Sequence, residues 1–212
     1  MQRFLIPALF IPLILTSCLT SLQPLVTYDN IITDNRLAGL WEQSGKSILI
    51  QQLGNSPFRT VFADARKENK PLSPKDSIFA LQHYIITYRE NGINYTWVAA
   101  LAKIGQSTFV SIVPEQCDDG NKIITPEGQS TYSFAKLEWS TDNSCQLWFL
   151  NGDYIKELVL SNKIRIQHEY DSLFGTFVIT APAQELEQFL EKYGNDERLF
   201  RDGSAITLFR KT

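Results

Sequence analysis

Short segments rich in Val, Ile, Thr and aromatic residues, separated by turn-forming residues, recur along most of this chain. Such segments favour half-buried β-strands. The strongest local signal is Asn91-Gly92, which lies between two of them and suits a type I′ hairpin turn because both central residues of that turn need positive φ. The predicted strands cover residues 39–43, 47–53, 59–63, 78–90, 93–103, 108–113, 131–140, 146–150, 163–170, 175–180 and 205–211.

Two helices are expected to interrupt these strands, a short one over residues 153–160 and a clearer one after Thr180. The second carries an apolar stripe at helical spacing, formed by Leu186, Phe189, Leu190 and Tyr193. Many short strands with a late packing helix predict a mostly β protein. We therefore expect a single antiparallel barrel, or a sandwich, with one or two short helices packed on it.

The first residues have the composition of a secretory leader. Arg3 is the only charged residue before position 18, and residues 4–15 are apolar throughout. A membrane-spanning helix needs about 20 apolar residues, so this run is too short to serve as one. Residues 1–17 are therefore predicted to be a signal peptide that is removed.

The leader ends in Leu15-Thr16-Ser17-Cys18. This pattern, an aliphatic residue, two small residues and a cysteine, resembles the processing site of bacterial lipoproteins. The resemblance implies that the Cys18 thiol receives a diacylglycerol and that Cys18 becomes the first residue of the mature chain. Two or three acyl chains anchor a protein stably, whereas a single one does not. The alternative is an ordinary leader or a buried helix that happens to precede a cysteine.

The residues after Cys18 bear on location and organisation. Leu19, not an aspartate, follows the cysteine, and residues 19–28 carry no charge. The lipoprotein resemblance then implies an anchor in the outer membrane facing the periplasm, with the cell surface as the alternative. Residues 18–35 lack a strand or helix period and are expected to form a lipid-anchored tether. A single β-rich domain is expected over residues 36–212.

Charge narrows the class of partner. The chain has a formal net charge of −3, and no block of basic residues. We therefore expect no nucleic-acid partner. The expected partners are the membrane, through the lipid on Cys18, and either a small hydrophobic ligand or another envelope protein.

Two cysteines remain once Cys18 carries lipid, Cys117 and Cys145, and both lie in turn-like surroundings. An oxidising periplasm permits a disulfide between them. The sequence leaves a bridge and two free thiols equally open, because the geometry of the fold decides between them.

One stretch indicates a particular kind of barrel. Gly39-Leu40-Trp41 opens the first predicted strand and resembles the G-x-W motif of lipocalin-like barrels. The resemblance implies that Gly39 allows a tight start to the strand and that Trp41 plugs the closed end of the barrel. It also implies that Arg210, on the last strand, packs across Trp41. The chain as a whole is also similar to uncharacterised lipoproteins of Bacteroidota, which indicates a location and no activity.

No constellation of residues indicates catalysis. The two histidines, His83 and His168, lie in separate predicted strands without a second ligand at metal spacing. The sequence contains no G-x-S-x-G motif and no glycine-rich phosphate loop. We therefore expect no metal site, no cofactor and no catalytic residue, and an enzyme ranks third among the candidate functions.

Aromatic residues in the predicted strands are the remaining functional signal. They could line a pocket for a small hydrophobic ligand, or they could be ordinary core and cross-strand packing. The second arrangement would suit a structural or protein-interaction module with a solid core. The candidate pocket residues are Trp41, Tyr84, Tyr88, Tyr95, Trp97, Phe109, Trp139 and Trp148.

Overall fold

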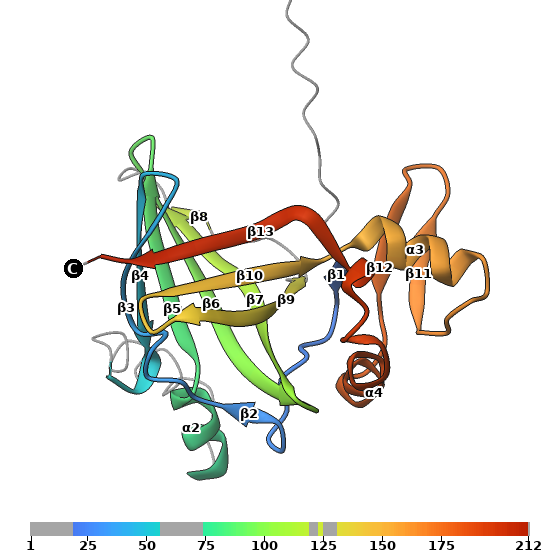
Figure 1. The fold of residues 1–212 in the computed structure, drawn as a ribbon, viewed down its shortest axis with the longest axis horizontal. Helices are drawn as coiled ribbons and strands as arrows, with labels where there is room; N and C mark the ends of the chain where they lie inside the picture. Colours follow the sequence, from blue (N-terminus) through green and yellow to red (C-terminus); the bar gives the residue numbers. More distant parts are fainter. Residues whose placement is uncertain (1–18, 56–73, 119–122, 125–130, 212) are drawn as a thin grey trace, which may run out of the picture.

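The computed structural model describes residues 19–55, 74–118, 123–124 and 131–211. Eight strands form a closed antiparallel barrel, which selects the barrel over the sandwich (Figure 1). The barrel closes because β7 pairs with β9 as well as with β6. In spatial order its strands are β9 (Tyr132–Thr141), β10 (Ser144–Leu150), β13 (Phe200–Arg210), β3 (Gly39–Gln43), β4 (Lys46–Gln52), β5 (Tyr84–Glu90), β6 (Ile93–Ile104) and β7 (Ser107–Asp118).

Tight turns join neighbouring strands at one end of the barrel. Asn91 and Gly92 have φ of +51° and +84°, and Glu90 pairs with Ile93 across them, so the predicted hairpin is confirmed. Ser44 and Gly45, with φ of +51° and +79°, make a second such turn between β3 and β4. Positive φ at both positions matches the right-handed twist of the strands that follow.

Alternate residues along the barrel strands point inward and form what we call the inner cluster. Cross-strand pairing keeps these residues on the same face from strand to strand, as in the row Tyr84, Ala99 and Ile112. The buried members are Leu37, Trp41, Ile50, Tyr84, Ala99, Leu101, Val110, Ala135, Leu137, Cys145, Leu147 and Leu208.

A second apolar core, the outer cluster, lies between the outside of the barrel wall and the elements packed on it. The wall contributes residues such as Ala102, Phe109 and Phe134, from β6, β7 and β9. The covering elements are the N-terminal segment, α3 (Gly152–Leu160), β12 (Thr176–Ile179) and α4 (Ala183–Tyr193). Figure 1 shows α3, α4, β11 and β12 gathered at one side of the barrel.

Both predicted helices are confirmed. The side chain of Asn151 caps α3, since its Oδ1 accepts a hydrogen bond from the N–H of Tyr154 (3.2 Å). On α4 the predicted stripe faces the outer cluster, with Leu186, Phe189 and Leu190 buried. A further helix, α2 (Pro74–Leu81), was not predicted. The strand predicted over residues 78–90 is therefore wrong at its start, and β5 begins only at Tyr84.

The remaining strands are short. β11 (His168–Asp171) pairs with β12, and β8 (Ile123–Ile124) pairs with β7. Residues 163–167 were predicted as part of a strand but precede β11 as irregular chain. Their Ile164 and Ile166 are nevertheless buried in the outer cluster. The predicted strand over residues 59–63 lies outside the described residues.

The expectation of a free tether before residue 36 is wrong for the described residues 19–35. β1 (Thr20–Ser21) pairs in parallel with β12 and antiparallel with β9, and β2 (Ile31–Ile32) pairs with β6. Apolar side chains of this segment lie in the outer cluster, namely Leu19, Leu25 and Val26. The segment has no period because irregular backbone, rather than a regular element, presents these side chains. The folded unit therefore includes Leu19 and the residues that follow it, and Arg36 lies inside it.

Candidate functional site

One end of the barrel is closed by Trp41, whose side chain is fully buried. Its Nε1–H donates a hydrogen bond to the carbonyl oxygen of Leu37 (2.8 Å). The guanidinium carbon of Arg210 lies 4.6 Å from the centre of the indole ring, in cation–π geometry. Gly39 is needed beside them, because a Cβ at that position would collide with the Arg210 guanidinium and its φ is +148°. This is the arrangement that the G-x-W resemblance implies.

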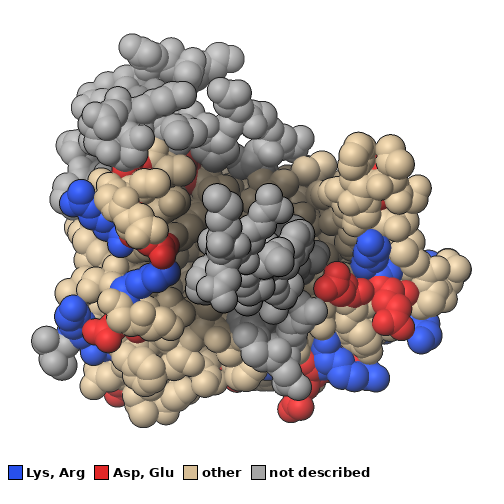
Figure 2. Space-filling view, turned by 90° about the horizontal axis from the view of Figure 1, so that it is seen from above, with Lys and Arg blue, Asp and Glu red and all other residues tan. Residues whose placement is uncertain are grey.

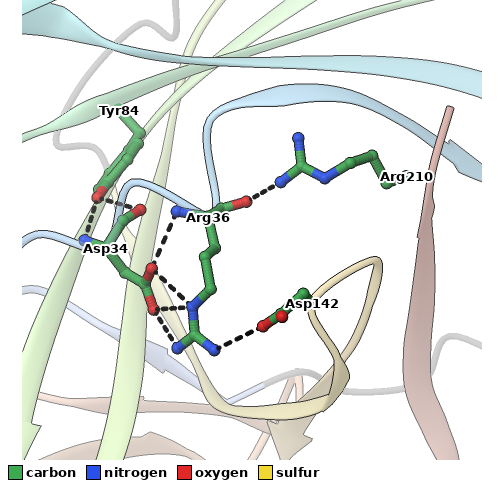
Figure 3. A network of polar contacts seen from close by, with 5 residues as sticks. All are labelled: Asp34, Arg36, Tyr84, Asp142 and Arg210. Carbon is green, nitrogen blue, oxygen red and sulfur yellow. Dashed lines mark hydrogen bonds and ion pairs between the residues drawn. The ribbon is translucent and has the colours of Figure 1, made fainter. Parts of the chain in front are cut away.

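A short strap, residues 34–38, crosses this closed end and is held by polar contacts (Figure 3). The N–H of Asp34 donates to the Tyr84 hydroxyl (2.7 Å), which in turn donates to the Asp34 carbonyl oxygen (3.1 Å). Arg210 donates to the carbonyl oxygens of Ala38 (3.2 Å) and Arg36. Strand β13, strand β5 and the strap are thus tied together beneath Trp41.

The side chain of Arg36 stabilises the strap on the outer side of the closed end. Its guanidinium forms an ion pair with Asp34 (2.7 Å) and lies 4.3 Å above the ring of Trp139, which in turn contacts Trp41 at 6.1 Å between ring centres. The hydrogen bonds from Arg36 lower the pKa of the Asp34 carboxyl. Asp142 approaches the same guanidinium at 3.6 Å.

Above this plug the barrel is hollow. A cavity of about 370 Å³ occupies the middle of the lumen and its open end. Most of the residues around it are aliphatic or aromatic, and the few polar ones include Gln43 and Lys46 beside the β3–β4 turn. The cavity is lined by Gln43, Lys46, Ile48, Ile50, Ile86, Tyr88, Trp97, Ile112, Pro114, Ser133, Leu147, Phe149, Ile206 and Leu208.

Aromatic rings form one wall of this cavity toward its mouth. Tyr88 on β5 stacks against Trp97 on β6, with ring centres 4.7 Å apart and planes 14° from parallel. Tyr95 also stacks against Tyr88 at 4.8 Å and 13°, and its ring centre lies 6.2 Å from that of Trp97. At the rim, Lys46 Nζ forms an ion pair with Glu90 (2.7 Å). Among the described lining residues the pocket is therefore mostly apolar, and the charged one, Lys46, lies at the entrance.

The eight aromatic residues predicted as pocket residues fall into three groups. Tyr88 and Trp97 line the cavity, and Tyr95 extends their stack. Trp41, Tyr84 and Trp139 form the closed end rather than the pocket.

The last two, Phe109 and Trp148, are wrong as pocket residues because they point out of the barrel. Phe109 is buried in the outer cluster, and Trp148 packs against that cluster and borders a separate cleft with Lys136 and Glu138. Apolar residues occupy both faces of these strands, as in Phe109-Val110 and Leu147-Trp148, so the sequence does not show which face is inward.

Most of the lining was missed by sequence reasoning, because it is aliphatic. Ile48 with Ile50, and Ile206 with Leu208, repeat every second residue along β4 and β13. This period is the signal that would have identified them. The predicted pocket residues were all aromatic, although aliphatic residues supply more of the lining.

The two cysteines are free thiols in the structure, so the disulfide is not formed. Cys117 pairs with Tyr95 near the open end of the barrel, whereas Cys145 pairs with Trp139 at the closed end. A disulfide needs Cα atoms within about 7 Å, and the two ends of one barrel cannot meet that condition. Burial raises the pKa of the Cys145 thiol to about 11.

Neither histidine contributes to the cavity. Nδ1 of His83 lies 3.0 Å from the carbonyl oxygen of Phe79, and Nδ1 of His168 lies 2.9 Å from that of Ile166. Within the described ranges, no group of three or more His, Cys, Asp or Glu side chains is placed to hold a metal ion. Nor does that part of the chain include a helix long and apolar enough to span a membrane.

Comparison of the chain with protein-family models, curated proteins and solved structures gives no match. The fold and the cavity are therefore the basis for a functional proposal.

Proposed function

We propose that this chain is a lipid-anchored protein of the bacterial cell envelope whose barrel binds one small apolar molecule. The cavity between the Trp41 plug and the β3–β4 turn carries the proposal. Its volume of about 370 Å³ lies within the range of small-molecule pockets, roughly 300–1,000 Å³. Its composition, apolar walls with a few polar groups at the entrance, is also typical of such pockets.

The ligand class follows from the walls. Ile48, Ile86 and Ile112 offer no hydrogen bonds to a buried polar group, so a polar ligand would lose its hydration without compensation. Tyr88 and Trp97 offer ring faces near the mouth. We infer an apolar molecule whose polar end remains at the rim, beside Gln43 and Lys46. A hollow lumen also favours a binding function over the structural module, which would require a filled interior.

The location is part of the same proposal. The Leu15-Thr16-Ser17-Cys18 pattern supports lipidation of Cys18, and the residues after it favour the outer membrane facing the periplasm. In this position a barrel would hold or carry an apolar molecule that is poorly soluble in the aqueous envelope space.

Two neighbouring positions on β4 test the binding function. Ile48 lines the cavity, whereas Leu49 points outward and is 37% exposed. Purified protein is titrated with the neutral fluorescent probe N-phenyl-1-naphthylamine. We expect saturable binding that weakens by at least about tenfold in Ile48→Trp, which fills the lumen, and stays unchanged in Leu49→Trp.

Thermal unfolding of both variants serves as the control for folding. Absence of saturable binding, for this probe and for a panel of long-chain acyl and isoprenoid compounds, would overturn the proposal. Equal weakening in the two variants would place the probe outside the lumen and would also overturn it.

A further inference from the structure

The turn between β11 and β12 presents two neighbouring apolar side chains to solvent. Leu173 is 82% exposed and Phe174 is 79% exposed, the highest values for large apolar residues in the described part of the chain. Isolated exposed apolar residues are common on protein surfaces, whereas two adjacent ones at the tip of a turn are a candidate contact site.

The turn is held in shape by its own hydrogen bonds. Asp171 Oδ1 accepts from the N–H groups of Leu173 (2.8 Å) and Phe174 (3.2 Å). Gly175 closes the turn with φ of +69°, and Lys156 on α3 donates to the Gly175 carbonyl oxygen (3.0 Å). These contacts fix the backbone and leave the two apolar side chains directed away from the domain.

The same edge of the sheet is where the described chain begins. β1 and β12 run in parallel, with Thr20 beside Val178 and Ser21 beside Ile179. Both strands therefore start at the same end of the sheet. The turn that precedes β12 and the residue that precedes β1 both lie at that end. Leu19 is that residue, it is 3% exposed, and it is bonded directly to Cys18.

We propose that Leu173 and Phe174 insert into the lipid bilayer that holds the Cys18 anchor. This inference rests on the lipidation that is part of the proposed function. A lipid attached at Cys18 would start from the same end of the strands as the turn. Because Leu19 and β1 are packed into the fold, no flexible linker of described residues separates the domain from the lipid. Apolar side chains at that edge gain by leaving water for the boundary of the acyl chains.

The charge of this side of the molecule agrees with an apolar rather than an electrostatic contact. Figure 2, which looks at the molecule from above the view of Figure 1, shows blue and red side chains interspersed over the described surface. The described residues of this face therefore form no basic patch for anionic lipid headgroups.

Two contacts with one bilayer would fix the orientation of the barrel. The β3–β4 and β5–β6 turns, which border the open end of the lumen, lie on the same upper side of Figure 1 as the β11–β12 turn. The mouth of the cavity would then face the membrane, from which an apolar ligand can enter without crossing water.

The experiment places a fluorophore at the turn. The full chain, processed in cells, is reconstituted in vesicles of phosphatidylethanolamine and phosphatidylglycerol. The variant Phe174→Cys is made in a Cys117→Ala background, in which the remaining native thiol, Cys145, is buried, and is labelled with the NBD group. The matched control is Ile78→Cys on α2, another exposed apolar position (64%) at the opposite side of the molecule in Figure 1.

We expect the label at position 174 to shift its emission to shorter wavelength and to be quenched by nitroxide-labelled lipid, while the label at position 78 does neither. Leu173→Cys, labelled in the same way, should give the same response as Phe174→Cys. Vesicle flotation reports the anchor independently of the turn.

Three outcomes would overturn the inference. Protein that floats with the vesicles but shows equal responses at positions 174 and 78 would retain the anchor and exclude the turn. Protein that does not float would exclude the anchor and the inference together. Cross-linking of position 174 to an envelope protein in intact cells, without quenching in vesicles, would assign the turn to a protein partner instead.

Discussion

Phe134 and Phe149 lie on the neighbouring strands β9 and β10 and point to opposite sides of the same barrel wall. Phe134 is 1% exposed and is enclosed by the outer cluster, which packs the N-terminal segment, α3, β12 and α4 against the wall. Phe149 borders the cavity in the lumen. Two apolar regions are thus packed differently: the outer cluster is filled, whereas the lumen beside Phe149 contains a cavity.

The largest expected effect separates these two phenylalanines. Phe134→Ala creates a new cavity in a filled core and should lower the free energy of unfolding by about 3–5 kcal/mol. Phe149→Ala enlarges a cavity that already exists, so we expect about half that loss. Urea unfolding of both variants measures the difference. Equal losses would mean that the lumen is packed as tightly as the outer cluster.

The closed end of the lumen should protect Cys145 from chemical modification. With a pKa of about 11, only about one Cys145 thiol in a thousand is ionised at pH 8, and the thiolate is the reactive form. In urea, with the ordinary thiol pKa of about 9, roughly one in ten is ionised at that pH, so iodoacetamide should modify Cys145 about a hundredfold more slowly in the folded chain. Mass spectrometry of the labelled peptides identifies the site. Similar rates in the two states would contradict a dry closed end.

The same raised pKa makes stability depend on pH at the alkaline side. As the pH rises above about 9, the thiol of the unfolded chain ionises while that of the folded chain does not. This group therefore favours folding below that pH and loses its contribution as the pH rises toward 11. Cys145→Ala should flatten this part of the stability profile.

Substitution of Arg210 tests how much its contacts with the strap and with Trp41 contribute to stability. Arg210→Met removes the donors to the carbonyl oxygens of Ala38 and Arg36 and the cation over Trp41, and should lower stability by about 2–3 kcal/mol. Arg210→Lys should recover only part of the loss, because an ammonium group lacks the planar fork. Tryptophan fluorescence during urea unfolding follows the change. An unaffected midpoint would show that the strap holds without Arg210.

The smallest effect concerns Asp34 and Arg36. The hydrogen bonds from Arg36 lower the Asp34 pKa below its usual 3.8, so this pair stabilises the fold above that pH and loses its contribution as the pH falls through the lowered value. The pair is partly exposed, and the contribution should not exceed about 1 kcal/mol. Asp34→Asn should remove that share of the acid sensitivity. A profile that is unchanged below pH 4 would contradict this assignment.

Local patterns predicted much of the barrel. The period of two and the Asn91-Gly92 turn located the β5–β6 hairpin, and β3 was predicted with the bounds that it has. The apolar stripe of α4 was sufficient to predict that helix and its buried face. These features depend on residues close together in the sequence, which is why the sequence contains them.

The incorrect predictions concern residues whose structure depends on contacts with residues distant in the sequence. Residues 78–81 are apolar enough for a strand, yet they end α2, since a short apolar run suits either structure. Phe109 and Trp97 look alike as strand aromatics, but only the barrel wall determines which one faces the cavity. Leu25 and Val26 are buried by elements far along the chain, and no local period marks them.

The place of β1 has a consequence for the order in which the molecule is assembled. Thr20 and Ser21 pair with Tyr132 and Ser133 on one side and with Val178 and Ile179 on the other. Pairing between residues so distant in sequence carries a large entropic cost of loop closure and slows folding. The first described residues to be synthesised can therefore reach their native position only after nearly the whole chain has been made, so the fold is completed late.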